Sequence, residues 1–242
     1  QMCIRDRGIM NRTYEAMFPL FGVALIYLVT AAVCFILGKL LSFRHTGRFK
    51  ELYVREGFTA VALGWFVMSV FGAIPFVLTG EIPFYIDALF ETISGFTTTG
   101  SSILSDVEAL SYASLFWRSF THWIGGMGVV MFALVILPAL GTSKMMLSSV
   151  EMSTLARDNY RYRAQMVVQI LLFVYVGLTI FFTFMLKFAG MNWFDAVCHS
   201  MSACATSGFG TKNTSVAFYD SAMIDTVLIF AMGISGIHFG LI

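Results

Sequence analysis

Two short turns in the sequence combine hydroxyl side chains with glycine, and they lie far apart in the chain. Threonine and serine hydroxyls are neutral oxygen ligands, and glycine adopts backbone dihedral angles that side chains forbid. Such angles allow successive carbonyl oxygens to face one axis and to replace the water around a dehydrated cation. We therefore take the residues of both turns as candidate cation ligands: Thr98, Thr99, Gly100 and Ser101 in the first, and Thr206, Ser207, Gly208 and Phe209 in the second.

The two turns end a segment that the sequence contains twice. Residues 87–100 and 195–208 align without a gap at an offset of 108 positions. A repeat of this length indicates duplication of a whole structural unit rather than a solenoid. Each turn follows an apolar run, residues 86–96 or 194–204, that is predicted to be helical and is too short to cross a membrane. Broken backbone at membrane depth is tolerated only where it is buried in protein or lines a water-filled cavity, so each unit is predicted to be a pore loop with its pore helix.

The composition is that of an integral membrane protein. Of the 242 residues, 58% are hydrophobic and only 12% are charged, and the mean hydropathy is +0.80. A soluble domain carries roughly a quarter charged residues. No basic cluster is interleaved with aromatic residues, so we expect no nucleic-acid partner. The sequence has no zinc-ligand spacing, hydrolase motif or nucleotide-binding fingerprint, so we expect no enzyme activity and no organic cofactor.

Five segments are apolar and long enough to be transmembrane helices. They are residues 16–38, 57–80, 112–138, 164–186 and a segment that begins near Ser221. The second is expected to break near Pro75, because proline interrupts the helical hydrogen bonds. The last reaches Ile242 without a polar flank, which indicates a chain cut inside a helix.

The distribution of lysine and arginine predicts the orientation. Residues 39–56 and 141–163 are rich in both, whereas residues 81–111 contain five acidic residues and neither Lys nor Arg. The positive-inside rule places the two basic loops in the cytoplasm, so both pore loops enter from outside. The C-terminal ends of the pore helices then point toward mid-membrane, where their partial negative charge stabilises a cation. A short helix at the interface is expected within the second basic loop, over residues 145–156.

Several residues near the pore loops allow more than one interpretation. Asp87 and Asp195 fall in the first turn of the two pore helices, where a carboxylate complements the helix N-terminus. We assign both to support of the pore helices rather than to direct attraction of ions. A cluster of small residues in the third span is either a hinge or, as we favour, a site of close helix packing: Gly125, Gly126 and Gly128.

Three polar side chains in apolar surroundings also have competing interpretations. Arg118 and His122 share a helix face, because they are four residues apart. They could steer ions, but an anchor at the interface, held by a glutamate or by backbone, is favoured. An ionisable residue within the membrane is a functional candidate by default. His199 is nevertheless interpreted as a hydrogen-bonded packing residue of the pore helix rather than a proton carrier.

Four segments carry a resemblance to a known family. Their patterns are D-A-x-F-E-x-x-S-G-x-T-T-T-G (residues 87–100), W-x-G-G-M-G (123–128), A-x-x-I-L-P (133–138) and F-D-A-x-x-H-S (194–200). These patterns resemble the Trk/Ktr/HKT superfamily of potassium transporters, and within it the TrkH-type membrane subunit. The resemblance implies an all-α integral membrane protein of tandem helix–pore-loop–helix repeats around a pseudo-fourfold axis. This sequence holds two of the expected four repeats.

The resemblance also implies a division of the chain. A truncated or non-native leader is followed by an extra transmembrane helix with its cytoplasmic loop, a first repeat, a cytoplasmic connector and a truncated second repeat. The corresponding residues are 1–14, 15–56, 57–140, 141–163 and 164–242.

The function implied by the resemblance is potassium uptake across the cytoplasmic (inner) membrane through a carbonyl-lined selectivity filter. Gly100 stands at the position that goes with potassium rather than sodium preference. The expected partners are membrane lipid, a second copy of the full-length protein and a cytoplasmic RCK-type nucleotide-binding subunit. One alternative is a two-pore-loop channel subunit that works as a dimer, and another is a non-conducting scaffold or sensor. Passive flow and symport with protons or sodium both stay open. The potassium ligands are expected at Thr98, Thr99, Gly100, Thr206, Ser207 and Gly208.

Overall fold

The computed structural model describes residues 25–30, 32, 36, 39, 54–145 and 154–236. Residues 25–30 are helical and fall within the predicted span 16–38. The rest of that span lies largely outside the described residues. So do the leader, most of the first basic loop and most of the expected interface helix.

Every regular element in the described residues is a helix, and the same order of elements occurs twice. The first repeat consists of α2 (Val54–Leu78), the short α3 (Tyr85–Phe96) and α4 (Tyr112–Met145). The second consists of α5 (Thr154–Phe188), the short α6 (Trp193–Cys204), the 3-10 turn η2 (Ser215–Tyr219) and α7 (Ala222–Gly236). The predicted all-α class and the predicted duplication of a helix–pore-loop–helix unit are confirmed.

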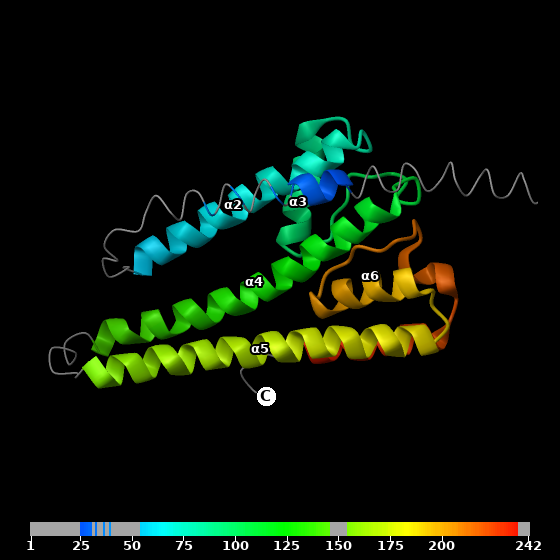
Figure 1. The fold of residues 1–242 in the computed structure, drawn as a ribbon. Helices are drawn as coiled ribbons and strands as arrows, with labels where there is room; N and C mark the ends of the chain where they lie inside the picture. The colour runs from blue at the N-terminus through cyan, green and yellow to red at the C-terminus, as the bar shows by residue number, and fades with distance from the viewer. Residues whose placement is uncertain are drawn as a thin grey trace, which may run out of the picture.

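The short helices α3 and α6 pack against the long ones. Helix α3 contacts α2 and α4, and α6 contacts α4, α5 and α7. Figure 1 shows α4 and α5 running alongside each other, with both short helices beside the N-terminal half of α4. Helix α4 therefore touches both pore helices, although it belongs to the first repeat.

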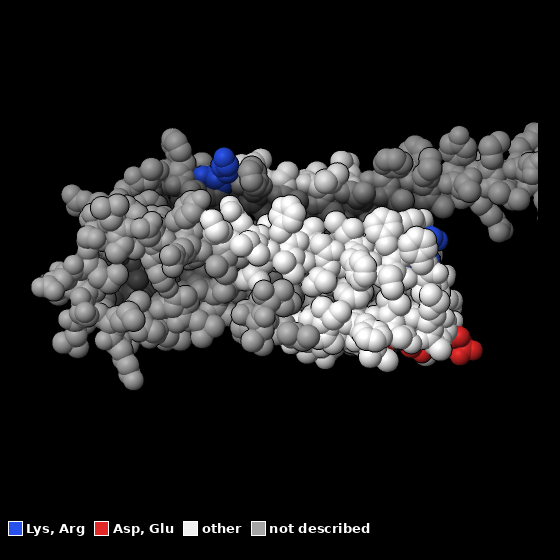
Figure 2. All heavy atoms as spheres, turned by 90° about the horizontal axis from the view of Figure 1, so that it is seen from below, with Lys and Arg blue, Asp and Glu red and all other residues white. Residues whose placement is uncertain are grey.

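The surface is suited to lipid. Residues Gln169–Phe188 of α5 form a 20-residue segment long and apolar enough to cross a membrane, with a mean hydropathy of 2.2. Shorter apolar stretches lie in α2 (Ala62–Leu78) and α7 (Ala222–Gly236). On the face seen in Figure 2, the described residues show a broad uncharged band, and their charged side chains lie toward its ends.

The predicted break of the second span near Pro75 is wrong. Helix α2 does not break at Pro75 but continues to Leu78, because only one turn remains after the proline. Trp117 Nε1 donates a hydrogen bond to the Gly72 carbonyl, at 3.0 Å, in the turn that the proline disturbs.

The connector 141–163 is also less of a loop than predicted, since α4 extends to Met145 and α5 begins at Thr154. The residues at the start of α5 are polar, but many of them are good helix formers, and polarity does not end a helix that leaves the membrane.

Candidate functional site

The two candidate turns have the same backbone geometry. After α3, the amide of Thr98 donates to the Gly95 carbonyl and that of Thr99 to the Ser94 carbonyl, both at 3.0 Å. After α6, the amides of Thr206 and Ser207 repeat these bonds to Ala203 and Ser202, again at 3.0 Å. This pair of bonds is the Schellman motif that ends many helices.

A threonine occupies the left-handed position of each motif. Thr98 has a φ of 56° and Thr206 a φ of 53°. A β-branched residue in this region is an outlier, and such strain costs about 1–3 kcal/mol and concentrates at functional sites. Glycine would fit both positions without strain. The threonine side chain is therefore retained at a cost in stability, which favours a role for its hydroxyl or its fixed backbone at this site.

The two turns meet at their glycines. A Cβ atom added to Gly100 would lie 2.7 Å from the backbone nitrogen of Gly208 and 3.0 Å from its Cα. Gly100 has a φ of 77°, so this position needs glycine for its dihedral angle as well as for space. Gly208 has no positive φ. The expected left-handed backbone is therefore not found at Gly208, and the close approach of the two turns depends on the missing side chain of Gly100.

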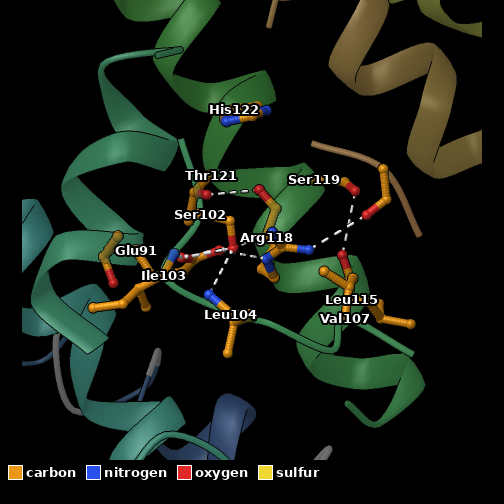
Figure 3. A network of polar contacts seen from close by, with 12 residues as sticks. Glu91, Ser102, Ile103, Leu104, Val107, Leu115, Arg118, Ser119, Thr121 and His122 are labelled. Atoms are coloured by element: carbon orange, nitrogen blue, oxygen red, sulfur yellow. Dashed lines mark hydrogen bonds and ion pairs between the residues drawn. The ribbon is translucent and has the colours of Figure 1, made fainter. Parts of the chain in front are cut away.

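A buried ion pair joins α3 to α4 beside Ser102, which follows the first turn (Figure 3). The side chains of Glu91 in α3 and Arg118 in α4 are 0% and 2% exposed, and Arg118 Nε lies 2.8 Å from Glu91 Oε1. The Glu91 carboxylate accepts hydrogen bonds from Ser102 Oγ (2.9 and 3.1 Å) and from the Ile103 amide (3.1 Å). The prediction that a glutamate holds Arg118 is thus confirmed. Its place at the membrane interface stays a prediction.

Aromatic packing fixes the second turn. The Phe209 ring is buried and lies between two side chains of α4. The Arg118 guanidinium carbon is 4.1 Å from its centroid, and the His122 ring stacks on it with a centroid distance of 4.0 Å. His122 Nδ1 also contacts the hydroxyl of Ser207. One helix of the first repeat therefore holds the turn of the second.

The hydroxyls of the first turn bond to each other. Thr97 Oγ1 lies 2.8 Å from Thr99 Oγ1, and Ser101 is exposed. No group of three or more His, Cys, Asp or Glu side chains among the described residues could hold a metal ion. The oxygens available to a cation here belong to hydroxyl groups and to the backbone, which suits a monovalent cation better than a transition metal.

The two aspartates differ in their contacts. Asp87 and Asp195 lie in the first turns of α3 and α6, as predicted. Neither helix has a side-chain hydrogen bond from its N-cap residue. Asp195 Oδ1 accepts a hydrogen bond from Thr211 Oγ1 at 2.7 Å, which ties the start of the pore helix to the segment after the second turn. His199 Nδ1 lies 2.9 Å from the Asp195 carbonyl oxygen, in line with its interpretation as a hydrogen-bonded packing residue.

The glycines of α4 stand at close contacts. A Cβ on Gly125 would lie 2.3 Å from the carbonyl oxygen of Phe96, at the end of the first pore helix. One on Gly126 would lie 2.9 Å from the Cα of Ala205, at the end of the second. At Gly128 the nearest atom would be a Trp65 ring carbon at 3.0 Å. These distances favour packing over a hinge as the role of this cluster.

We expect Gly125→Ala to reduce the yield of folded protein sharply. The added methyl group must displace backbone at the end of α3, and overpacking of this kind costs about 1–3 kcal/mol or more. Gly177→Ala in α5 is the matched control, because nothing lies within 4 Å of its added Cβ. The check is the thermal unfolding temperature of detergent-purified protein. If Gly125→Ala and Gly177→Ala are equally stable, the close packing of α4 on α3 is refuted.

The sequence identified the turns but not what supports them. Arg118 and Glu91 were visible as opposite charges in apolar segments, but their pairing requires knowing that α4 packs on α3. The left-handed threonines carry no sequence signal of their own, since glycine is the residue expected at such positions.

Comparison with known proteins gives a consistent family. A family model described as TrkH, cation transport protein, matches residues 26–242. The Trk system potassium uptake protein TrkH of Salmonella typhimurium is 39% identical over 222 residues, which are 91% of this chain and 46% of that protein. The Escherichia coli K12 protein of the same name is 38% identical over the same length.

A solved structure agrees with these relatives. The crystal structure of the potassium transporter TrkH from Vibrio parahaemolyticus matches with a TM-score of 0.72 at 31% identity, over 89% of this chain and 46% of that one. The chain thus spans about half the length of the relatives that it matches. From the family model, which matches nearly the whole chain, and from the fold, we conclude that the chain belongs to the TrkH family of cation transport proteins.

Proposed function

We propose that this chain forms half of a potassium-selective pore in the cytoplasmic membrane, as part of the pore-forming subunit of a Trk-type uptake system. Its family consists of cation transporters, which are membrane proteins and not an enzyme family. The observation that carries the proposal is the meeting of two equivalent pore-loop turns at Gly100 and Gly208. Relatives named as potassium uptake proteins support potassium as the cation.

The repeated geometry suits a filter. Each turn places a threonine in the left-handed region directly after a short helix, and the two turns share the same hydrogen bonds. Backbone and hydroxyl oxygens of equivalent residues would then face one axis from two sides. Potassium gives up its hydration shell only where enough oxygens replace the water. Two further repeats would supply the other half of the ring.

The pore helices add a favourable field. Helices α3 and α6 each end in the turn that would carry ion ligands. The C-terminal end of a helix carries roughly half a negative charge, which stabilises a cation near the turn without a buried carboxylate in the path. The buried carboxylate of Glu91 is paired with Arg118 instead.

The remaining partners follow from the family likeness. We propose that the basic segments 39–56 and 141–163 face the cytoplasm, where an RCK-type nucleotide-binding subunit would dock. We also propose that the full-length protein forms a homodimer in the membrane.

A growth and flux assay tests the function. The four-repeat transporter, meaning this chain continued by the two repeats that we propose to complete the ring, should restore growth of potassium-uptake-deficient cells at low potassium. It should also take up radioactive rubidium, and added potassium should inhibit this uptake whereas added sodium should not. A transporter that reaches the membrane and restores no growth would contradict the proposal. If sodium inhibits rubidium uptake as strongly as potassium does, the protein is a cation pore without a preference for potassium.

A further inference from the structure

One buried side chain touches both turn segments. Arg118 projects from α4 and is 2% exposed, and its partner Glu91 is 1% exposed. A buried guanidinium is costly unless its hydrogen bonds are made. Its N–H groups donate hydrogen bonds to the segments that follow both turns, and these segments lie far apart in the sequence.

On one side Arg118 holds the segment after Gly100. Its Nη2 donates to Ser102 Oγ at 3.2 Å, while its Nε is paired with Glu91 at 2.8 Å. Glu91 in turn accepts from the same Ser102 hydroxyl at 2.9 Å. The first turn is thereby fixed to both its own pore helix and α4, as Figure 3 shows.

On the other side Arg118 holds the segment after Gly208. Its Nη1 donates to the Gly210 carbonyl oxygen at 3.3 Å. Its guanidinium plane also covers the Phe209 ring at 4.1 Å. The carbonyl of Gly210 is thus engaged by protein, which restrains this end of the second turn.

We propose that Arg118 is a positioning residue that sets the spacing between the two turns at Gly100 and Gly208, and thereby the cation preference of the filter. This inference rests on the proposed function. The preference of an oxygen ring for one ion over another depends on the placement and number of its oxygens. A planar group with several fixed donors holds two segments at one separation better than a flexible ammonium does.

The second repeat, as far as the structure describes it, does not contain this arrangement. At the offset of 108 positions that aligns the two turns, Glu91 corresponds to His199. Helix α7 begins 110 positions after α4, so the position of Arg118 along α4 corresponds to Leu228 in α7. His199 bonds to its own helix through Nδ1, and its Nε2 has no hydrogen-bond partner among the described residues. Leu228 is a buried apolar residue. The second repeat therefore holds no equivalent ion pair at these positions.

The test measures ion preference in the four-repeat transporter, because a flux ratio does not depend on how much protein is present. Arg118→Lys keeps the charge beside Glu91 but removes the planar donors. The double variant Glu91→Gln with Arg118→Gln leaves no unpaired buried charge. Both should lower the potassium-to-sodium flux ratio by about tenfold, the equivalent of one hydrogen bond to a charged group.

The matched control is Ser69→Ala in α2. Ser69 is also buried, and its hydroxyl donates to the Trp65 carbonyl of its own helix at 2.9 Å. Its flux ratio should equal that of the parent. If neither Arg118 variant reaches the membrane, Ser102→Ala decides, because it removes the shared hydroxyl and leaves the ion pair in place.

An unaltered ratio in Arg118→Lys and in the double variant would overturn the inference while leaving the proposed function intact. An unaltered ratio in Ser102→Ala has the same meaning where that variant decides. A parent transporter that does not prefer potassium would instead contradict the proposed function.

Discussion

Residues 1–242 expressed alone should leave potassium-uptake-deficient cells unable to grow at low potassium. The two turns touch at Gly100 and Gly208, so together they bound the ion path from two sides only. An ion that faces lipid or water on its other sides keeps much of its hydration shell. Coordination by the oxygens of two turns alone is therefore not selective. The expected effect is complete loss of rescue, although the chain is inserted in the membrane.

The same cells carrying the four-repeat transporter provide the control for this experiment. Membrane fractions should contain both proteins, which separates failed transport from failed insertion. Robust growth with residues 1–242 alone would contradict the half-pore account. It would show that two copies assemble into a working pore, as a two-pore-loop channel subunit does.

The duplication allowed the pore helices to be located from the sequence. Residues 86–96 and 194–204 were predicted as helices, and α3 and α6 begin one residue earlier and end at the predicted residues. Apolar runs and a repeat at a fixed offset can be recognised in the sequence without knowledge of tertiary contacts. The structure brings Gly100 and Gly208 of the two turns together. Potassium binding by the residues of either turn stays a prediction.

The interactions that fix the turns could not be predicted in the same way. The contact between Gly100 and Gly208 joins residues 108 positions apart, and neither glycine names its partner. Arg118 reaches the Gly210 carbonyl across 92 positions. Such contacts depend on how α4 crosses both pore helices, which periodicity does not encode. At Pro75 the sequence predicted a feature that the structure does not have. The proline disfavours a helix, but it is accommodated one turn before α2 ends.

Replacing Gly100 with serine in the four-repeat transporter should lower its potassium-to-sodium flux ratio by about tenfold or more. The φ of 77° is strained for any residue with a side chain, at a cost of about 1–3 kcal/mol. The new Cβ would also lie 2.7 Å from the Gly208 nitrogen, so backbone must move. Each 1.4 kcal/mol corresponds to about a tenfold change in an equilibrium. A smaller ion is held by fewer and closer oxygens, so a distorted ring should lose potassium preference before it loses sodium passage.

Two comparisons isolate the effect of Gly100. Gly208→Ala should be milder, because its added Cβ would lie 3.9 Å from Gly100 atoms, an ordinary contact, and its φ is not positive. Gly177→Ser in α5 should leave the ratio unchanged, since nothing lies within 4 Å of that position. The predicted order of effects is therefore Gly100, then Gly208, then Gly177.

The potassium-to-sodium flux ratio of Gly100→Ser, measured in proteoliposomes with equal amounts of parent and variant, is the most direct test that these turns form the filter. We expect a ratio at least about tenfold below that of the parent, with sodium flux retained. A Gly100→Ser transporter that reaches the membrane and keeps the parent's ratio would show that ions are selected elsewhere.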